Sequence, residues 1–133
     1  MYKRQVYAVE CEPDACALIR RNREKFAAWN LSLIEGRAPA ALEALPAPDA
    51  VFIGGTKGSM AAVVDTVLAK NANARICIAA IALESLSAAI AALTAHGLSA
   101  EVTQLAVSRT RPAGRLHLLT ANNPIFLITG ERK

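Results

Sequence analysis

The sequence has few aromatic residues and no long uninterrupted hydrophobic run. Aromatic residues make up 5% of the 133 residues, whereas apolar residues reach 53%, a composition typical of helices packed on a buried sheet. Apolar stretches such as 79–83 and 88–93 are interrupted by Glu84, Ser85 and Ser87 and are far shorter than a membrane span. We therefore expect a cytoplasmic protein with no membrane partner and no secretory signal.

The sequence also lacks the residue spacings of metal centres and hydrolases. Neither His96 nor His117 has a partner at metal-ligand spacing, and no nucleophile elbow is present. The cysteines are odd in number, so Cys11, Cys16 and Cys77 are expected to be reduced thiols. We predict no metal site, and the sequence by itself assigns no catalytic residue.

The charge balance is basic, with a net charge of +4. Arginine and lysine gather at 20–25, and further arginines lie at 109–115. Such clusters are compatible with nucleic acid or with a polycarboxylate and do not choose between them. Because aromatic residues that could stack on bases are few, an RNA-binding module is the less favoured interpretation, and we expect no nucleic acid partner.

Hydrophobic periodicity predicts strands that alternate with helices over the first three quarters of the chain. Pro13 is expected to open the first helix, with Leu18, Ile19, Asn22 and Phe26 on one face, and Ser59 is expected to cap a later helix. The predicted strands are 5–10, 31–35, 49–53 and 75–81, and the predicted helices are 13–26, 39–45, 60–70 and 84–96.

After residue 99 the pattern predicts strands only, at 100–107, 115–120 and 125–129, separated by turns at 112–114 and 122–124. Alternating strands and helices indicate an α/β fold with a mostly parallel sheet and right-handed crossovers. In the strand-only tail, the last two strands are expected to form an antiparallel edge of the sheet. We treat residues 1–133 as a single domain.

Ligands of doubly wound sheets bind beyond the carboxyl ends of the strands, so residues at those ends are the candidates for a site. Glu10 suits either a ribose-binding acid or an ordinary acid before a helix. Gly36-Arg37-Ala38 suits either the approach of an adenine ring or a plain turn. Gly54-Gly55 suits either close approach of a large ligand or a flexible turn. We expect Glu10, Gly36 and Gly54 to meet at one end of the sheet.

Two arginines close to the last turns form a further candidate. Arg109 and Arg111 could each bind a carboxylate through two parallel hydrogen bonds. An alternating charged run such as this is also compatible with a solvated surface strand or loop. The residues alone leave both interpretations open.

Six segments together resemble one protein family. At their spacing they are similar to the decarboxylating precorrin methyltransferases of the CbiT type, which are equivalent to the C-terminal domain of CobL-type enzymes. The resemblance extends from Gln5 to Gly130, and the most specific motifs are DAVFIGG and the closing NPxFxITG. The segments are VYAVECEPDACALIRRNREKF, LIEGRAPAAL, PDAVFIGGTKG, ALESL, VTQLAVSRTRP and NPIFLITG.

The resemblance implies a Rossmann-like fold and an S-adenosylmethionine-dependent reaction. It implies methyl transfer to carbon 15 of a precorrin-6-type tetrapyrrole in cobalamin biosynthesis, coupled to loss of carbon dioxide from the acetate side chain at carbon 12. Carried over by position, Glu10 would hold the cofactor ribose, Gly36, Arg37 and Ala38 would line the adenine, Gly54 and Gly55 would border the methyl group, and Arg109 and Arg111 would bind substrate carboxylates.

The family pattern begins with a strand and a G-x-G-x-G turn that precede the segment equivalent to Tyr7–Glu10. By comparison this chain is expected to lack that first strand and glycine loop, to bind S-adenosylmethionine weakly by itself, and to form a homo-oligomer through exposed strand edges. Arg37 stands where many methyltransferases have an acid. The alternative is a noncatalytic methyltransferase-like oligomerising protein that binds no cofactor.

Overall fold

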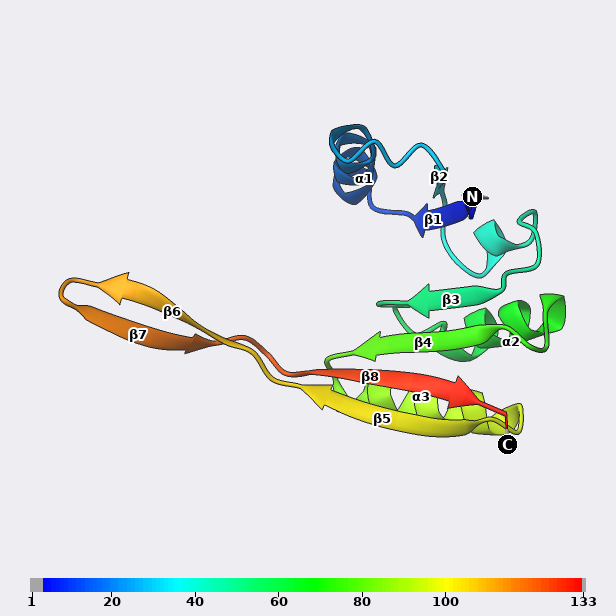
Figure 1. Cartoon of the computed structure of the whole chain (residues 1–133). Coiled ribbons are helices and arrows are strands. Elements are labelled where there is room, and N and C mark those ends of the chain that lie inside the picture. Colours follow the sequence, from blue (N-terminus) through cyan, green and yellow to red (C-terminus); the bar gives the residue numbers. More distant parts are fainter. Residues whose placement is uncertain (1–3, 133) are drawn as a thin grey trace. The chain divides into compact units, whose positions relative to one another are not determined.

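A computed structural model describes residues 4–132 of the chain (Figure 1). These residues fall into two compact units, one ending at Pro46 and the other beginning at Ala47. None of the described helices combines the length and apolar character needed to cross a membrane.

The first unit is a parallel pair of strands with one helix. The register of the pair runs from Val6 opposite Leu31 to Glu10 opposite Glu35. Pro13 occupies the first turn of the helix, where its missing N–H removes no helical hydrogen bond. The elements are β1 (Val6–Glu10), α1 (Pro13–Lys25), β2 (Leu31–Glu35) and the short 3₁₀ helix η1 (Ala40–Leu42).

Helix α1 packs through a narrower face than its sequence pattern predicts. Cys16 is the buried residue of the helix and Ile19 is half-buried, whereas Leu18 and Phe26 are 46% and 69% exposed. The predicted apolar face is therefore only partly used. A pair of strands offers a narrow surface, and a helix on it cannot bury a broad stripe.

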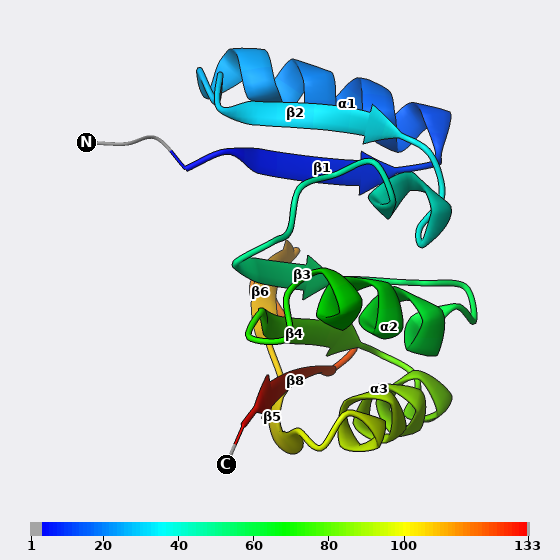
Figure 2. The same ribbon diagram turned by 90° about the vertical axis from the view of Figure 1, so that its right-hand side faces the viewer.

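The second unit is a four-stranded sheet with α2 and α3 on one face (Figure 2). The strand order is β3-β4-β8-β5, with β3 and β4 parallel and β8 antiparallel to both of its neighbours. The elements are β3 (Ala50–Ile53), α2 (Met60–Lys70), β4 (Arg75–Ala80), α3 (Leu83–Ala95), β5 (Ser99–Leu105), β6 (Ser108–Ala113), β7 (Leu116–Ala121) and β8 (Ile125–Glu131).

The core of this unit lies between the sheet and the two helices. Ile78, Leu93 and Ile128 are fully buried, and Ile78 lies directly opposite Ile128 in the ladder. Gly130 belongs to the same face, because a Cβ added there would lie 2.8 Å from Cδ2 of Leu93. A larger residue at this position would therefore force the Leu93 side chain to shift.

The predicted antiparallel edge is present, but it is formed by β8 and β5, with β5 outermost. The last two strands, β7 and β8, do not pair with each other, because β7 pairs with β6 in a separate hairpin. Strand β6 was not predicted, because Pro112 suggests a turn, yet Pro112 lies opposite His117 in a two-stranded hairpin with β7. The predicted helix at 39–45 is reduced to η1. Ser59 stands at the start of α2, but its hydroxyl donates to the carbonyl of Thr56 at 2.7 Å and does not cap the helix.

Among the described residues, β1 pairs only with β2, and β3 pairs only with β4. Each of these two strands therefore keeps one edge without a strand partner, in agreement with the expected exposed edges. Self-association through such edges stays a prediction.

Burial on the helix-covered face generates a stability test. Ile128→Ala should lower the free energy of unfolding by about 2–5 kcal/mol, since it leaves a cavity beside Ile78 and Leu93. Leu127→Ala is the matched control, because Leu127 is half-buried on the opposite face of the same strand, and it should cost roughly 1 kcal/mol. Urea denaturation followed by circular dichroism measures both. Equal losses would contradict the assignment of the faces.

Candidate functional site

Glu10 lies at the carboxyl end of β1, and backbone donors hold its side chain. One carboxylate oxygen, Oε1, accepts hydrogen bonds from the backbone N–H groups of Cys11 at 2.7 Å and Glu12 at 2.8 Å. The residue is half-buried. A carboxylate fixed in this way is a suitable acceptor for the hydroxyl groups of a ribose, because its orientation does not have to be ordered when the ligand binds.

Gly36 is held next to Glu10 by a backbone hydrogen bond, in which the Gly36 N–H donates to the carbonyl oxygen of Glu10 at 2.9 Å. Packing favours the glycine at this turn, since an added Cβ would lie 3.0 Å from Cβ of Ala41 and the neighbour would have to move. Arg37 is exposed and Ala38 is half-buried. The structure thus brings Glu10 and the segment 36–38 together at the carboxyl ends of β1 and β2.

Gly54 and Gly55 follow β3 in the second unit, and neither packing nor backbone conformation explains them. A Cβ added to either residue meets no atom within 4 Å, and neither has a positive φ. Gly58, further along the same loop, does have a φ of +95°, a conformation that favours glycine. Gly54 and Gly55 therefore leave open space beyond the carboxyl end of β3, as a bound ligand would need.

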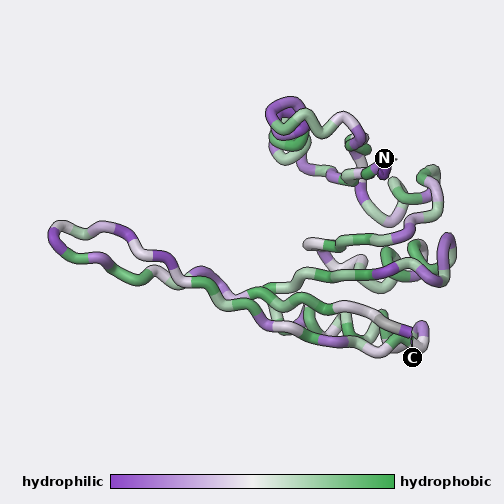
Figure 3. The backbone as a smooth tube through the Cα atoms, in the orientation of Figure 1, coloured by the Kyte–Doolittle hydropathy of each residue, from purple (hydrophilic) through white to green (hydrophobic). Residues whose placement is uncertain are grey.

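Arg109 and Arg111 lie on β6, in the hairpin with β7, and both are exposed. The hairpin continues from the end of the sheet at which β3 and β4 finish (Figure 1). Arg109 faces Thr120 across the hairpin and Arg111 faces Leu118. Figure 3 shows hydrophilic and hydrophobic residues side by side along this arm.

Only part of the predicted convergence is observed. Glu10 and Gly36 meet within the first unit, whereas Gly54 belongs to the second. The meeting of Gly54 with the other two stays a prediction.

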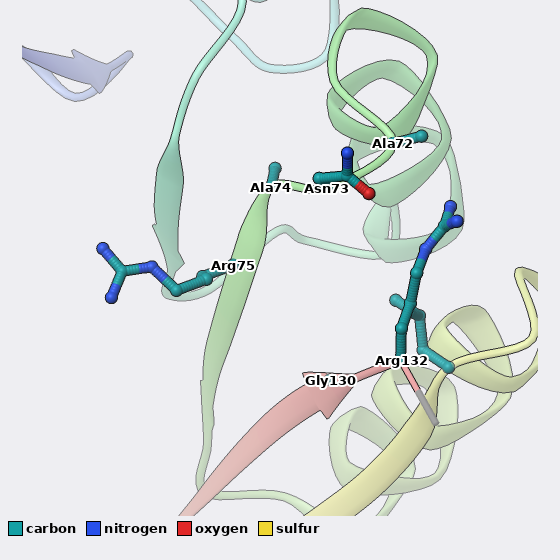
Figure 4. A pocket seen from close by; sticks show the side chains of 7 residues that line it. Ala72, Asn73, Ala74, Arg75, Gly130 and Arg132 are labelled. Carbon is teal, nitrogen blue, oxygen red and sulfur yellow. The ribbon is translucent and has the colours of Figure 1, made fainter.

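A pocket of about 310 Å³ lies in the second unit at the amino end of β4, whereas Gly54 and Gly55 follow the carboxyl end of β3 (Figure 4). Its lining includes Arg75, Gly130 and Arg132. The two guanidinium groups point in different directions and do not converge on a common point (Figure 4). The pocket is therefore a poor candidate for an anion site.

A family model described as the precorrin methyltransferase domain matches residues 2–132. The chain therefore belongs to the precorrin methyltransferase domain family. This membership agrees with the resemblance of the sequence motifs and with the α/β architecture of both units.

Individual members of the family support the assignment. The chain is 39% identical over 126 residues to a probable cobalt-precorrin-6B C(15)-methyltransferase (decarboxylating) of Pyrobaculum calidifontis, covering 94% of this chain and 65% of that relative. It matches the crystal structure of precorrin-6y C5,15-methyltransferase from Geobacter metallireducens with a TM-score of 0.88 and 34% identity, over 97% of this chain and 67% of that one. The chain spans about two thirds of the length of the curated relatives that it matches.

The sequence pattern alone does not reveal the groups that hold the Glu10 carboxylate. The two backbone donors come from the loop that leads into α1, and Cys16 on the first turns of α1 approaches the Glu10 carbonyl oxygen with its Sγ at 3.5 Å. The nearest signal in the sequence is Pro13, whose place at a helix start implies a tight connection after β1.

The cysteines differ in environment, and this generates a reactivity test. Burial raises the pKa of the Cys16 thiol, and the carboxylates of Glu35 and Glu10 raise it further. Cys11 is exposed. Iodoacetamide near neutral pH should therefore alkylate Cys11 first and leave Cys16 protected until the unit unfolds, as peptide mass spectrometry would show. Early labelling of Cys16 would contradict its buried position.

The raised pKa of Cys16 also determines the direction in which this residue changes the free energy of unfolding with pH. Because the Cys16 thiol is harder to ionise in the folded state, the unfolded chain loses this proton at lower pH. The contribution of Cys16 to stability is then present below about pH 8.5 and is lost as the pH rises through its folded pKa. A Cys16→Ala variant should lack this alkaline decline.

Proposed function

We propose that this chain carries the ribose-binding, methyl-bordering and substrate-binding elements of a decarboxylating precorrin methyltransferase. The reaction would transfer a methyl group from S-adenosylmethionine to carbon 15 of a precorrin macrocycle and release carbon dioxide from its acetate side chain at carbon 12. The observation that carries the proposal is the unexplained glycine pair, Gly54 and Gly55, in a member of this family. Glu10 is the second support.

The proposed cofactor end uses two kinds of contact. The carboxylate of Glu10 would accept hydrogen bonds from the ribose hydroxyls, and Gly36, Arg37 and Ala38 would line the adenine. The bound cofactor would supply an electrophilic methyl group. The chain would contribute position: methyl transfer depends chiefly on aligning donor, methyl and acceptor carbon, so no acid–base pair is required of these residues for that step.

The proposed substrate surface is one face of the β6–β7 hairpin. Successive side chains of a strand point to opposite faces, so Arg109 and Arg111 share a face. Leu118 and Thr120 lie opposite them on β7 and share that face too. Guanidinium groups beside an apolar side chain suit a macrocycle that has a hydrophobic ring and a carboxylate rim.

The cofactor proposal is tested with S-adenosylhomocysteine. The 133 residues contain no G-x-G-x-G turn, and without the several hydrogen bonds of such an anchor their affinity for the cofactor should be lower by about two or more orders of magnitude. Isothermal titration should therefore give a dissociation constant weaker than micromolar. Chemical shifts of the backbone amides of Glu10, Gly36 and Gly55 should nevertheless move together in a two-dimensional NMR titration.

Two variants distinguish a glycine that leaves space for a ligand from a glycine that is needed for packing. Gly55→Val should leave the melting temperature nearly unchanged and weaken binding about tenfold or more, because the new side chain enters only ligand space. Gly36→Val, in contrast, should lower the melting temperature, because it collides with Ala41. If Gly55→Val bound the cofactor analogue as well as the wild type, Gly55 would not border the ligand. If the wild-type chain bound it tightly, the expected weak affinity would be wrong.

The substrate surface is tested with a carboxylated porphyrin as a stable substitute for the precorrin. Arg109→Ala and Arg111→Ala should each weaken binding about tenfold at low salt, the loss of one charge-assisted pair. Arg115→Ala removes the same charge at the exposed hairpin turn and should have a much smaller effect. Absorbance titration in the Soret band measures all three. Equal effects at the three positions would show only nonspecific attraction.

A further inference from the structure

The end of helix α1 presents a surface that the proposed reaction does not use. Phe26 and Trp29 are 69% and 59% exposed, and Trp29 is the only tryptophan of the chain. Exposed aromatic residues next to cations are the composition found at the centres of protein interfaces. We define the basic aromatic patch as Arg21, Arg23, Lys25, Phe26 and Trp29.

Cations and aromatic rings of this patch contact each other. The guanidinium of Arg23 lies 5.8 Å from the centroid of Trp29, and the ammonium of Lys25 lies 5.3 Å from the centroid of Phe26. The Arg23 Nε is buried and has no hydrogen-bond partner among the described residues. Contacts of this kind hold the rings in place while leaving much of their surface exposed.

The backbone beneath the rings is ordered by consecutive hydrogen bonds. The N–H groups of residues 26–29 all donate to backbone carbonyls at 2.9–3.1 Å. Ala27 adopts a φ of 50°, a left-handed conformation that costs a non-glycine residue about 1 kcal/mol. The two aromatic residues are thus presented by a fixed turn, and a partner would lose little conformational freedom of this chain on binding.

The charge of the patch indicates the partner. Residues 15–29 contain four cations and one acid, Glu24, a net charge of +3 (4 − 1). Arg20 is paired with Glu35, but within the described residues no ion pair involves Arg21 or Lys25. The available cations are complementary to a negatively charged partner, and the exposed rings are complementary to apolar groups on the same partner.

We propose that the basic aromatic patch is a docking site for an acidic protein segment that carries apolar side chains. A nucleic acid strand fits less well, because Arg23 already lies over the Trp29 ring on which a base would stack. Acidic residues of a protein segment can pair with Arg21 and Lys25 at the rim, while its apolar side chains cover Phe26 and Trp29.

Trp29 reports on the patch directly, since it is the only tryptophan. The probe is a short blocked peptide of glutamates interrupted by leucines, and the controls are the same peptide with lysines in place of glutamates and an oligouridylate RNA. We expect the acidic peptide to shift Trp29 emission to shorter wavelength and to reduce its quenching by acrylamide. The lysine peptide should do neither.

Charge-reversal variants test the location. R21E/K25E should weaken binding of the acidic peptide tenfold or more at low salt, whereas Arg115→Glu, at an exposed position in the other unit, should change it less than twofold. Circular dichroism checks that both variants are folded. An unchanged Trp29 emission at millimolar acidic peptide, equal effects of the two variants, or tighter binding of oligouridylate would each overturn the proposal.

Discussion

The carbonyl oxygen of Glu10 ties together the parts of the first unit on which its candidate site depends. It accepts the Gly36 N–H at 2.9 Å, and the Sγ of Cys16 lies 3.5 Å away. One atom therefore joins the end of β1, the turn after β2 and the first turns of α1. Because the carboxylate of the same residue is fixed by two further backbone donors, its place relative to Gly36 is set by the main chain. The Cys16 thiol is small and buried next to the carboxylates of Glu35 and Glu10. The same position that brings it to the Glu10 carbonyl oxygen therefore also raises its pKa.

Hydrophobic periodicity was sufficient to predict most of the fold, and it failed where a strand has no core to face. The buried residues of β4 and β8 form apolar runs between turns, so both strands were found from the sequence. Strand β6 contains two arginines and Pro112 and is almost wholly exposed, so it has none of the alternation that burial produces. The face of α1 was also predicted too broadly, because the pattern shows which residues are apolar but not how much surface a pair of strands can cover.

Glycines at the strand ends illustrate what the sequence could not resolve. From the sequence alone, each of Gly36, Gly54 and Gly55 is compatible either with the close approach of a ligand or with a plain turn. The structure separates them by what an added Cβ would meet. At Gly36 it would crowd Cβ of Ala41 at 3.0 Å, whereas at Gly54 and Gly55 it would meet no atom within 4 Å. Composition cannot make this distinction, since close packing and ligand approach both select against a Cβ. The proposed ligand contacts are therefore supported better by Glu10 and by the glycine pair after β3 than by Gly36 itself.

The proposed docking patch and the candidate cofactor end occupy opposite ends of the first unit. Trp29 precedes the amino end of β2, and Gly36 follows its carboxyl end, five strand residues further on, a rise of about 17 Å in an extended chain. An acidic segment covering Phe26 and Trp29 would therefore leave the backbone donors around Glu10 accessible. The free energies of binding at the patch and at the strand ends would therefore add independently. Coupling between them would require α1, which connects the two sites, to move as a rigid element. The Arg20–Glu35 pair and the buried Cys16 fasten α1 to β2 and β1, so such movement is opposed, and the patch is suited to recruiting a partner without closing the site.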